Sequence, residues 1–353
     1  IKEGFMNLKP LLEKTRIATS VPCRIDFGGT LDIPTFFLPL SHMAPAGFNM
    51  ALDLRTRVSL KPHTPGRVFV ASRGFESAEF DAGKAPFNHP MGLIFACAQY
   101  FNAHGVKIEI DSASPPRSAL GGSSSASVAV LAAFFKALGE KIDPNQLAWL
   151  SHYIESSVAG VACGVQDQAA AAFGSGHLWE WKMGQTGPLF KKTPVFESER
   201  DLEYLSDRIL VAYCGIPHES KNINKQWVDS FIGAENREQF IKIVQITKLF
   251  FKAIQGKDFD LAGDLMNQET LLRLEMTPDV LDNTGKKLFE SAKSHGCGAR
   301  FTGAGGGGCI WAVGRCSNLS GLLESWKNIL EPVQDARILD TRIDPKGIMI
   351  HQP

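Results

Sequence analysis

Two stretches of the chain alternate between apolar and polar residues, which is the pattern of a half-buried β-strand: 51–60 and 106–111. A β-like run from Thr15 to Arg24 continues into Ile25-Asp-Phe27 and ends at a glycine turn. In the second half of the chain, apolar runs bounded by turn residues predict short strands at 208–213, 299–302, 309–313 and 337–342. Strands are therefore expected in both halves of the chain.

Apolar residues recur at helical spacing in several longer segments. In the first half they predict helices at 91–104, 125–138 and 143–158, the last begun by Asp143 as N-cap with Pro144 behind it. In the second half they predict helices at 238–253, 258–274, 278–295 and 319–330. Helices mixed with short strands in this order are typical of an α+β fold rather than of a repeated βαβ unit.

A boundary between two domains is predicted near residue 195. The segment 182–201 is mixed in charge and contains Pro188 and Pro194, so we interpret it as a loose connection. A chain of 353 residues is long for a single domain and sufficient for two. The predicted domains are 1–195 and 196–353.

The composition excludes several classes of protein. At 44% hydrophobic and 21% charged residues, the chain is close to the average for globular proteins. Lys plus Arg equals Asp plus Glu at 37 each, so no overall field attracts nucleic acid or an acidic membrane surface. Seven cysteines without a C-x-x-C pair argue against a disulfide framework and favour a reducing, cytoplasmic location. The longest apolar stretch, 126–135, is about half the length that a bilayer requires.

A run of small residues precedes the helix predicted at 125–138: Leu120-Gly-Gly-Ser-Ser-Ser-Ala126. Glycines allow backbone N–H groups to approach an anion, and the helix that follows directs its positive dipole end toward it. Serine hydroxyls add donors for phosphate oxygens or ligands for Mg²⁺. A Walker loop needs a lysine at the helix start, and none is present. The run is therefore either a different type of phosphate loop or a plain turn before a buried helix.

A second glycine run, Thr302-Gly-Ala-Gly-Gly-Gly-Gly-Cys309, contains the G-x-G-x-x-G spacing of dinucleotide-binding folds. That interpretation requires a helix after the glycines, whereas a predicted strand follows here. A glycine link between two strands instead lets the backbone lie close to a ligand, unless it serves only tight packing.

Two carboxylates are candidates for chemistry. Asp167 lies in Gly164-Val-Gln-Asp-Gln168, just before an alanine run, where it is either the N-cap of a short helix or a catalytic base. Glu155 lies near the end of the helix predicted at 143–158, where the helix dipole disfavours a negative charge, so a partner is expected. Since Gly160 turns the chain between them, the two carboxylates are predicted to converge, one on Mg²⁺ and one on a substrate hydroxyl.

Four motifs in order resemble the GHMP kinases, the superfamily of galactokinase, homoserine kinase, mevalonate kinase and phosphomevalonate kinase. They are the segment Val21–Asp32, the loop Pro116–Ala126, Glu155 followed by Gly164–Gln168, and the glycine run Phe301–Cys309. The resemblance implies a two-domain α+β fold, with an N-terminal ribosomal-protein-S5-like α/β domain and a C-terminal ferredoxin-like domain. It also implies that ATP and Mg²⁺ are used.

The resemblance implies a role for each residue that matches a family motif. Asp167 would be the base for the acceptor hydroxyl, and Arg24 would stabilise its charge. Glu155 and a loop serine would bind Mg²⁺: Ser123 when counted without a gap from Leu120, or Ser124 when the extra glycine is allowed for. The phosphates of ATP would be held by the loop Leu120, Gly121, Gly122, Ser123, Ser124 and Ser125.

The acceptor would be held by two further segments. Asp32 would bind sugar hydroxyls, with Asp26 as the alternative because the interval from Arg24 is one residue shorter than usual. The backbone of the second glycine run, at Gly303, Gly305 and Gly306, would support the phosphate or the acceptor. Ala119 stands where the family usually has the first glycine of the phosphate loop.

The first and third motifs are closer to the sugar-kinase branch than to mevalonate kinases, and bacterial heptose 7-phosphate kinases, galactokinase and fucokinase are the nearest types. The expected partner is thus a small sugar or sugar phosphate, with neither nucleic acid nor a membrane, for a monomer or a homodimer. Candidate acceptor-side residues are Arg55, Arg57, Lys221 and Lys225, and Tyr213, His218 and Ser220 after a predicted strand. Alternatives are a mevalonate-type kinase, an ATP-dependent decarboxylase and a catalytically silent sugar sensor.

Overall fold

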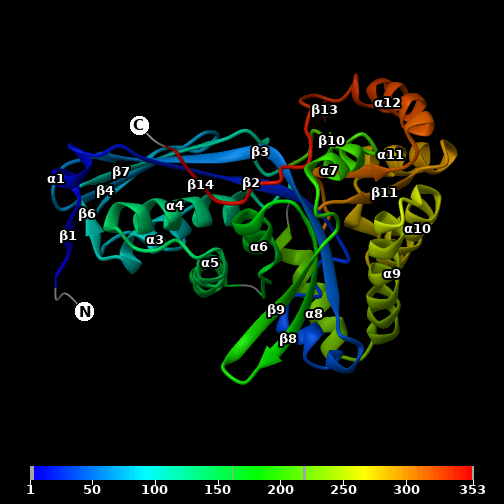
Figure 1. Ribbon diagram of the computed structural model, residues 1–353, viewed down its shortest axis with the longest axis horizontal. Coiled ribbons are helices and arrows are strands. Elements are labelled where there is room, and N and C mark those ends of the chain that lie inside the picture. Colours follow the sequence, from blue (N-terminus) through cyan, green and yellow to red (C-terminus); the bar gives the residue numbers. More distant parts are fainter. Residues whose placement is uncertain (1–3, 161, 218–219, 352–353) are drawn as a thin grey trace.

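The computed structural model describes residues 4–160, 162–217 and 220–351. These residues form an eight-stranded sheet built mainly from the first half of the chain and a four-stranded sheet from the second half (Figure 1). A short parallel pair of β1 (Met6–Asn7) and β6 (Ala103–His104) lies apart from both sheets. Helices pack against each large sheet. The expected α+β class is confirmed.

The centre of the larger sheet is the antiparallel pair of β2 (Ile17–Phe27) and β3 (Ala46–Pro62). On its other side, β3 pairs with β7 (Val106–Ser112) through its second half and with β8 (Gly176–Gly184) through its first half. β3 extends beyond the predicted 51–60 at both ends. Its first seven residues are all buried, so they show no alternation of apolar and polar residues, and the start of the strand was not predicted. The outer strands are β4 (Arg67–Ser72), β5 (Ala78–Asp81), β9 (Gly187–Pro194) and β14 (Met349–His351).

Four helices gather on the same side of this sheet, below β2 and β3 in Figure 1: α3 (Gly92–Tyr100), α4 (Gly122–Leu138), α5 (Pro144–Ala159) and α6 (Gln166–Phe173). α4 is the central one, packing on β2, β3 and the other three helices. α5 begins as predicted, with the Asp143 carboxylate accepting from the N–H groups of Asn145 and Gln146. α3 ends at Tyr100, since the chain turns there into β6 instead of continuing to residue 104.

The prediction of a loose connection over 182–201 is wrong. Most of this segment belongs to the hairpin of β8 and β9, which extends the larger sheet from β3. The hairpin forms because Trp179 and Trp181 bury one face of β8 while the turn at Gly184 and Gly187 closes it. The predicted boundary at 195/196 falls in the connection from β9 to α7 (Glu199–Ser206).

The smaller sheet is antiparallel, in the order β11 (Gly298–Phe301), β12 (Cys309–Val313), β10 (Ile209–Tyr213), β13 (Arg337–Leu339). Its strands follow the order of a ferredoxin-like β-α-β-β-α-β unit, with several helices in place of one between β10 and β11. Its helices are α9 (Arg237–Gln255), α10 (Phe259–Met276), α11 (Asn283–Ser294) and α12 (Cys316–Leu330), and all four were predicted within a few residues except for the start of α11. That segment opens with the short 3₁₀ turn η2 (Pro278–Val280) before Asp282 caps the helix.

Shorter elements complete the chain: α1 (Lys9–Leu12), α2 (Pro34–Phe37), the 3₁₀ turn η1 (Ser41–Met43) and α8 (Ser220–Ile232). α8 packs on α2, and the sequence pattern did not predict it. β14 was also unpredicted, and it returns from the second half of the chain to pair with β2. Arg55 of β3 fixes this return, donating to the Asp344 carboxylate and to the carbonyl of Lys346 at 3.0 Å. Arg55 is therefore a structural residue and not an acceptor-side cation.

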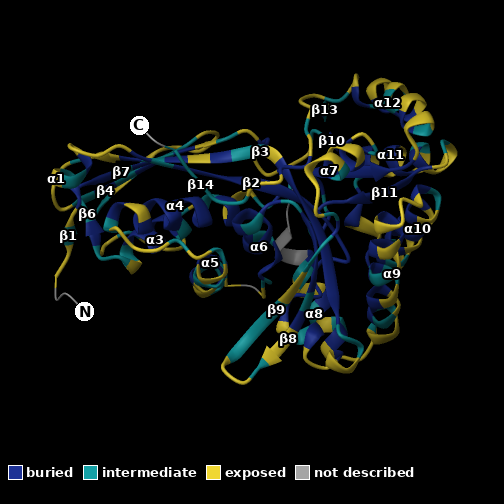
Figure 2. Cartoon of the chain, in the orientation of Figure 1, coloured by how far each residue is buried: buried dark blue, intermediate teal, exposed yellow. Residues whose placement is uncertain are grey.

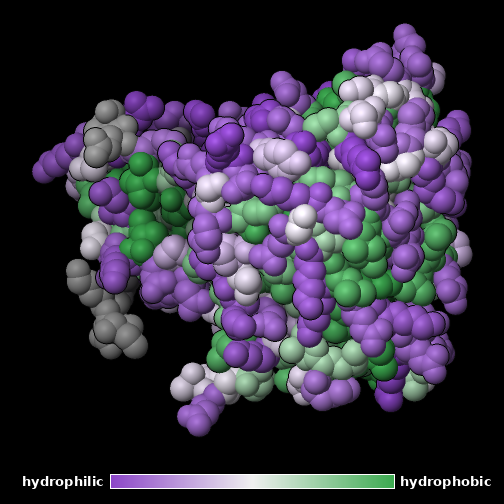
Figure 3. Space-filling model, turned by 45° about the vertical axis from the view of Figure 1, so that its right-hand side comes forward, coloured by the Kyte–Doolittle hydropathy of each residue, from purple (hydrophilic) through white to green (hydrophobic). Residues whose placement is uncertain are grey.

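Buried residues are concentrated in the strands of the sheets and on the helix faces that pack against them. β2 and β3 are dark over most of their length in Figure 2, whereas the outer faces of the helices are exposed. In Figure 3 the side that carries α9 and α10 is turned forward, and apolar areas lie there among polar ones; Leu249 and Leu271 are exposed on these helices. No helix in the described residues has both the length and the apolar character that crossing a membrane requires.

Candidate active site

A cavity of about 470 Å³ opens beside the start of α4 and contains most of the predicted site residues. Its apolar set of lining residues comes from β4, α3 and β7 and the turns beside them, and consists of Phe75, Met91, Leu93, Ile94 and Ile110. Its polar set comes from β2 and the turn after it, α6 and α8, and consists of Arg24, Thr30, Asp32, Asp167 and Asn224; Arg73 and Arg117 line the cavity elsewhere. The glycines and serines at the start of α4 also line the cavity, together with Glu155.

The start of α4 is shaped by Gly121, whose φ of +77° lies in the left-handed region. A Cβ at Gly121 would lie 3.2 Å from Oδ2 of Asp167, so a side chain at residue 121 would crowd this carboxylate. The left-handed φ and the close approach both favour glycine here. This turn lets the helix begin at Gly122, three residues before the predicted start. The serines therefore stand in the first turn of a 17-residue helix, where its dipole favours anions.

Both candidate serines contact the same carboxylate. The hydroxyls of Ser123 and Ser124 donate to the two oxygens of Glu155, at 2.8 Å and 2.7 Å. The side-chain amide of Gln168 adds a third hydrogen bond, at 2.5 Å. Burial raises the pKa of Glu155 above its ordinary value, although the two hydroxyls oppose this shift. The sequence predicted a partner for Glu155 because the end of a helix disfavours a negative charge, and the structure provides three hydrogen-bond donors.

Asp167 and Arg24 form a bidentate pair. Nε and Nη2 of Arg24 each donate to one oxygen of Asp167 at 2.8 Å. Burial would lower the pKa of Arg24, but the carboxylates of Asp167 and Asp26 reverse this and raise it above its ordinary value. Asp167 lies in the first turn of α6, whose N-cap is Val165, so it does not cap the helix. Of the two sequence interpretations, only the one in which Asp167 faces a site remains.

The main chain of the loop supports this pair. The carbonyl of Leu120 accepts the Arg24 N–H at 3.0 Å, and the carbonyl of Ala119 accepts Nη1 at 2.5 Å. The Leu120 side chain is fully buried and does not line the cavity. Ser125 also faces away, because its buried hydroxyl donates to the carbonyl of Pro22. The side chains of Leu120 and Ser125, two residues predicted to contact ATP, therefore anchor the loop and do not face the cavity.

Asp32 lies in the cavity wall and is 6% exposed. One carboxylate oxygen accepts the backbone N–H of Gln166 at 2.9 Å. A Cβ at Gly164 would lie only 1.7 Å from that same oxygen, so Asp32 occupies space that a side chain at residue 164 would need. Burial raises the pKa of Asp32 to about 7, against the opposing effect of the Gln166 N–H. Asp32 can therefore change its protonation state near neutral pH.

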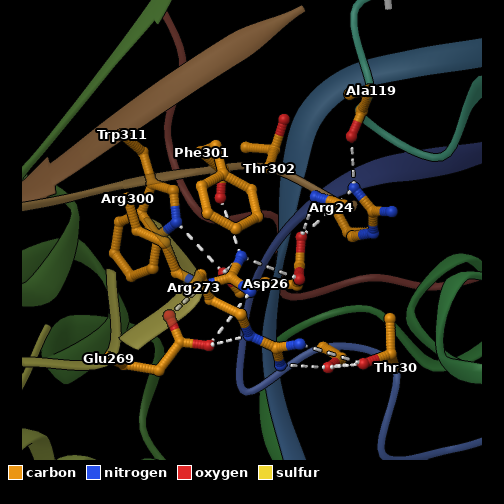
Figure 4. A network of polar contacts seen from close by, with 12 residues as sticks. Arg24, Asp26, Thr30, Ala119, Glu269, Arg273, Arg300, Phe301, Thr302 and Trp311 are labelled. Carbon is orange, nitrogen blue, oxygen red and sulfur yellow. Dashed lines mark hydrogen bonds and ion pairs between the residues drawn. The ribbon is translucent and has the colours of Figure 1, made fainter. Parts of the chain in front are cut away.

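Asp26, the alternative to Asp32, does not line the cavity. It is fully buried, and its carboxylate already binds the Gly303 N–H at 2.6 Å and Nη1 of Arg300 at 3.2 Å (Figure 4). Among the predicted glycines, Gly303 lines the cavity, whereas Gly305 and Gly306 pack on the backbone of Val280. The structure therefore favours Asp32 and Gly303 and separates the other three residues from the cavity.

Two residues of the polar set, Thr30 and Asn224, were not predicted. Asn224 of α8 lines the cavity, and its buried Oδ1 has no hydrogen-bond partner among the described protein atoms. The signal was weak because α8 is predominantly polar and its helical spacing was not recognised. Among the other acceptor-side candidates, Lys225 pairs with Asp229 on the surface, and Tyr213 lies in the core between the two halves. His218 and the side chains of Ser220 and Lys221 lie outside the described residues.

Comparison with known proteins assigns the two halves of the chain. Residues 88–175 match the family model "GHMP kinases N terminal domain", and residues 250–330 match "GHMP kinases C terminal". The first match spans α4, Glu155 and Asp167, and the second spans α10 and the glycine run. The predicted two-domain GHMP kinase fold is confirmed.

Individual relatives differ in their acceptors. The mevalonate kinase of Pyrococcus furiosus is 27% identical over 292 residues, covering 74% of this chain and 81% of its own. The D-glycero-alpha-D-manno-heptose 7-phosphate kinase of Campylobacter jejuni is 25% identical over 201 residues, covering 56% and 58%. The galactokinase of Lactococcus lactis, solved with galactose, superposes with a TM-score of 0.73 over 95% of both chains at 20% identity.

Proposed function

We propose that this chain, which carries both domains of the GHMP kinases, transfers the γ-phosphoryl group of ATP to a hydroxyl of a sugar. The observation that carries the proposal is the bidentate Arg24–Asp167 pair beside the first turn of α4, in the cavity that Asp32 and Asn224 also line. A kinase needs a base for the acceptor and a cradle for the phosphates within one enclosed space, and this cavity offers both.

In this mechanism Asp167 accepts or orients the proton of the acceptor hydroxyl. Arg24 holds the Asp167 carboxylate in place through two parallel hydrogen bonds, which fix both its position and its plane. The same guanidinium stabilises negative charge that develops on the transferred group. Since the transferred phosphoryl group is loosely bonded in the transition state, such positioning and charge stabilisation account for most of the catalysis.

The phosphates of ATP are assigned to the start of α4, where Gly121 and Gly122 expose backbone N–H groups at the positive end of the helix. The apolar set of lining residues provides a surface for the adenine ring. Glu155, Ser123 and Ser124 offer the all-oxygen donor set that suits Mg²⁺, to be completed by phosphate oxygens. When bound, Mg²⁺ would neutralise charge on the phosphates.

The polar set favours a sugar over mevalonate. Asp32 and Oδ1 of Asn224, which has no partner among the described protein atoms, are hydrogen-bond acceptors, and they fit the hydroxyl groups of a sugar. The carboxylate of mevalonate would instead require a cation. Arg24 is already paired with Asp167. The other described cations that line the cavity, Arg73 and Arg117, follow β4 and β7 and do not come from the segments that carry Asp32, Asp167 and Asn224.

The proposal is tested by incubating the protein with ATP and Mg²⁺ and a panel of acceptors: galactose, fucose, free heptoses, heptose 7-phosphate and mevalonate. We expect turnover with one of the sugars or with the sugar phosphate, and ³¹P NMR of the product locates the new phosphate. The Asp167→Asn variant serves as the control for contaminating kinases. Turnover of mevalonate alone would contradict the sugar assignment, and release of CO₂ would indicate a decarboxylase instead.

A further inference from the structure

A continuous chain of charged side chains leads from the cavity into the core of the C-terminal half. Negative and positive groups alternate along it, and Figure 4 shows the network around its centre. From the cavity inward its members are Asp167, Arg24, Asp26, Arg300, Glu269 and Arg273. The last three are fully buried and do not line the cavity, so none of them can contact a substrate directly.

Asp26 is shared between two arginines. Its Oδ1 lies 3.5 Å from Nη1 of Arg24, and its Oδ2 lies 3.2 Å from Nη1 of Arg300. Arg24 makes shorter contacts, of 2.8 Å, with Asp167. Arg300 therefore neutralises Asp26 from within the C-terminal half, and this leaves Arg24 directed toward Asp167.

Glu269 joins the next two arginines. Its carboxylate accepts from Nε of Arg300 at 2.8 Å and from Nε of Arg273 at 2.9 Å. Although burial raises the pKa of Glu269, the two arginines reverse the effect and hold it below its ordinary value, so the group is charged. Glu269 thus fixes the separation of the two guanidinium groups.

Arg273 extends the network back to the cavity at a second point. It donates to the carbonyl of Gly29 at 2.8 Å and lies 3.4 Å from the hydroxyl of Thr30, which lines the cavity. Thr30 has a φ of +73°, a conformation that a β-branched residue adopts only when its surroundings hold it there. The turn that Arg273 holds leads directly to Asp32.

We propose that Arg300 and Arg273 are positioning residues through which the C-terminal domain sets the geometry of the acceptor site. Arg300 acts through Asp26 on the Arg24–Asp167 pair, and Arg273 acts on the turn that presents Asp32. Buried ion pairs contribute little net stability compared with apolar residues of similar volume, so orientation is the effect to test. The inference rests on the proposed function, since it assigns Arg24, Asp167 and Asp32 to catalysis and acceptor binding.

The Arg300→Met variant tests the first path. With Asp26 no longer neutralised, Arg24 is expected to move toward it and away from Asp167, and kcat falls by about 100-fold while the KM for ATP is unchanged. The double variant Asp26→Asn/Arg300→Met removes both charges and is expected to regain most of the lost kcat. Arg315→Met, which removes an exposed ion pair with Asp260 in the same half, is the matched control. Equal losses in single and double variants would overturn the proposal.

The Arg273→Met variant tests the second path. It is expected to raise the KM for the acceptor by about tenfold, as for a misplaced binding group, with a smaller change in kcat and none in the KM for ATP. A parallel loss of ATP affinity would instead indicate general unfolding and would contradict the assignment. Thermal unfolding of each variant shows whether it is folded at the assay temperature.

A crystal structure of the Arg300→Met variant separates this inference from the proposed function. We expect the Arg24 guanidinium to be displaced toward Asp26, whether or not an acceptor has been identified. If the wild-type protein phosphorylates none of the acceptors, the proposed function fails, yet the position of Arg24 still decides this inference. An unchanged Arg24–Asp167 pair in that structure would exclude it.

Discussion

Arg24 and Asp167 lie 143 residues apart in the chain and meet through two parallel hydrogen bonds of 2.8 Å. Arg24 comes from the central strand β2 and Asp167 from the first turn of α6, two elements that pack directly on each other. Because both elements belong to the rigid core of the N-terminal half, the pair is held in place before any ligand binds.

Replacing Asp167 with Asn is expected to preserve the fold and ATP binding and to reduce turnover by about 10²–10⁴-fold. Asn keeps the shape of the side chain but cannot take up the acceptor proton, and it also loses the charge that holds Arg24. Steady-state kinetics and nucleotide titration measure the two effects separately. Asp81→Asn, at an exposed ion pair with Arg67, is the matched control and should leave both unchanged. A fully active Asp167→Asn protein would remove Asp167 from the mechanism.

Asp32 is expected to make acceptor use depend on pH. Its carboxylate binds sugar hydroxyls best when ionised, and burial raises its pKa to about 7. We therefore expect kcat/KM for the acceptor to decline as pH falls through about 7. The Asp32→Asn variant should show weaker acceptor binding without this decline. The two pH profiles, measured at saturating ATP, provide the comparison, and matching declines would assign the titration to another group.

The same pKa has a consequence for stability. Because the folded-state pKa of Asp32 is above the ordinary value of 3.8, the neutral form is favoured in the folded protein. Its stabilising contribution is complete below about pH 4 and is lost as pH rises through about 7. Urea unfolding should therefore show Asp32→Asn and wild type to be similar at pH 4, with the variant more stable at pH 8. A variant less stable at pH 8 would contradict the shift.

Ser123 and Ser124 are expected to differ in their effect on Mg²⁺. Both donate to Glu155, but Ser123 is exposed to the cavity whereas Ser124 is 5% exposed. Ser123→Ala should raise the Mg²⁺ concentration needed for half-maximal turnover by about 10–100-fold. Ser124→Ala should have a smaller effect, since its hydroxyl mainly orients Glu155. Titration of Mg²⁺ at fixed ATP measures both, and a larger effect of Ser124→Ala would exchange the two roles.

Ala119 is expected to be strained. Its φ of +61° lies in the left-handed region, which costs an ordinary residue about 1–2 kcal/mol and glycine nothing. After the greater entropy of an unfolded glycine is allowed for, Ala119→Gly should stabilise the protein by about 0.5–1 kcal/mol. Urea unfolding measures this change. Ala44→Gly, at a second left-handed alanine with φ +48°, repeats the test at another position and should also gain stability. A loss of stability in both variants would contradict backbone strain at these alanines.

The elements with strong local patterns were predicted well. β7 and α5 were located almost to the residue, because alternation and an Asp-Pro cap are properties of neighbouring residues alone. The β8–β9 hairpin, β14 and α8 were missed for a common reason. Each is stabilised by a distant partner, β3, β2 or α2, so its own sequence carries only part of the information.

The candidate site was likewise predicted only in part from the sequence. The sequence by itself determined which residue types gather near the loop, because the motifs that carry Arg24, Glu155 and Asp167 are contiguous stretches with characteristic spacing. Only the tertiary structure decided between alternatives that share such a motif. Asp26 and Asp32 lie on the same segment, yet the burial of one against Arg300 and the exposure of the other to the cavity depend on the C-terminal domain.

The buried charged residues show most clearly what the sequence alone did not predict. Glu269, Arg273 and Arg300 lie in ordinary-looking helix and strand sequences, where charged residues are usually solvated. Their complete burial and their alternation with Asp26 and Arg24 follow from the packing of α10 and β11 against the end of β2 and the segment after it. Local chemistry was thus readable from the chain itself, whereas the pairing of charges across the two domains was set by the fold, because a charge can be buried only where tertiary contacts bring its partner.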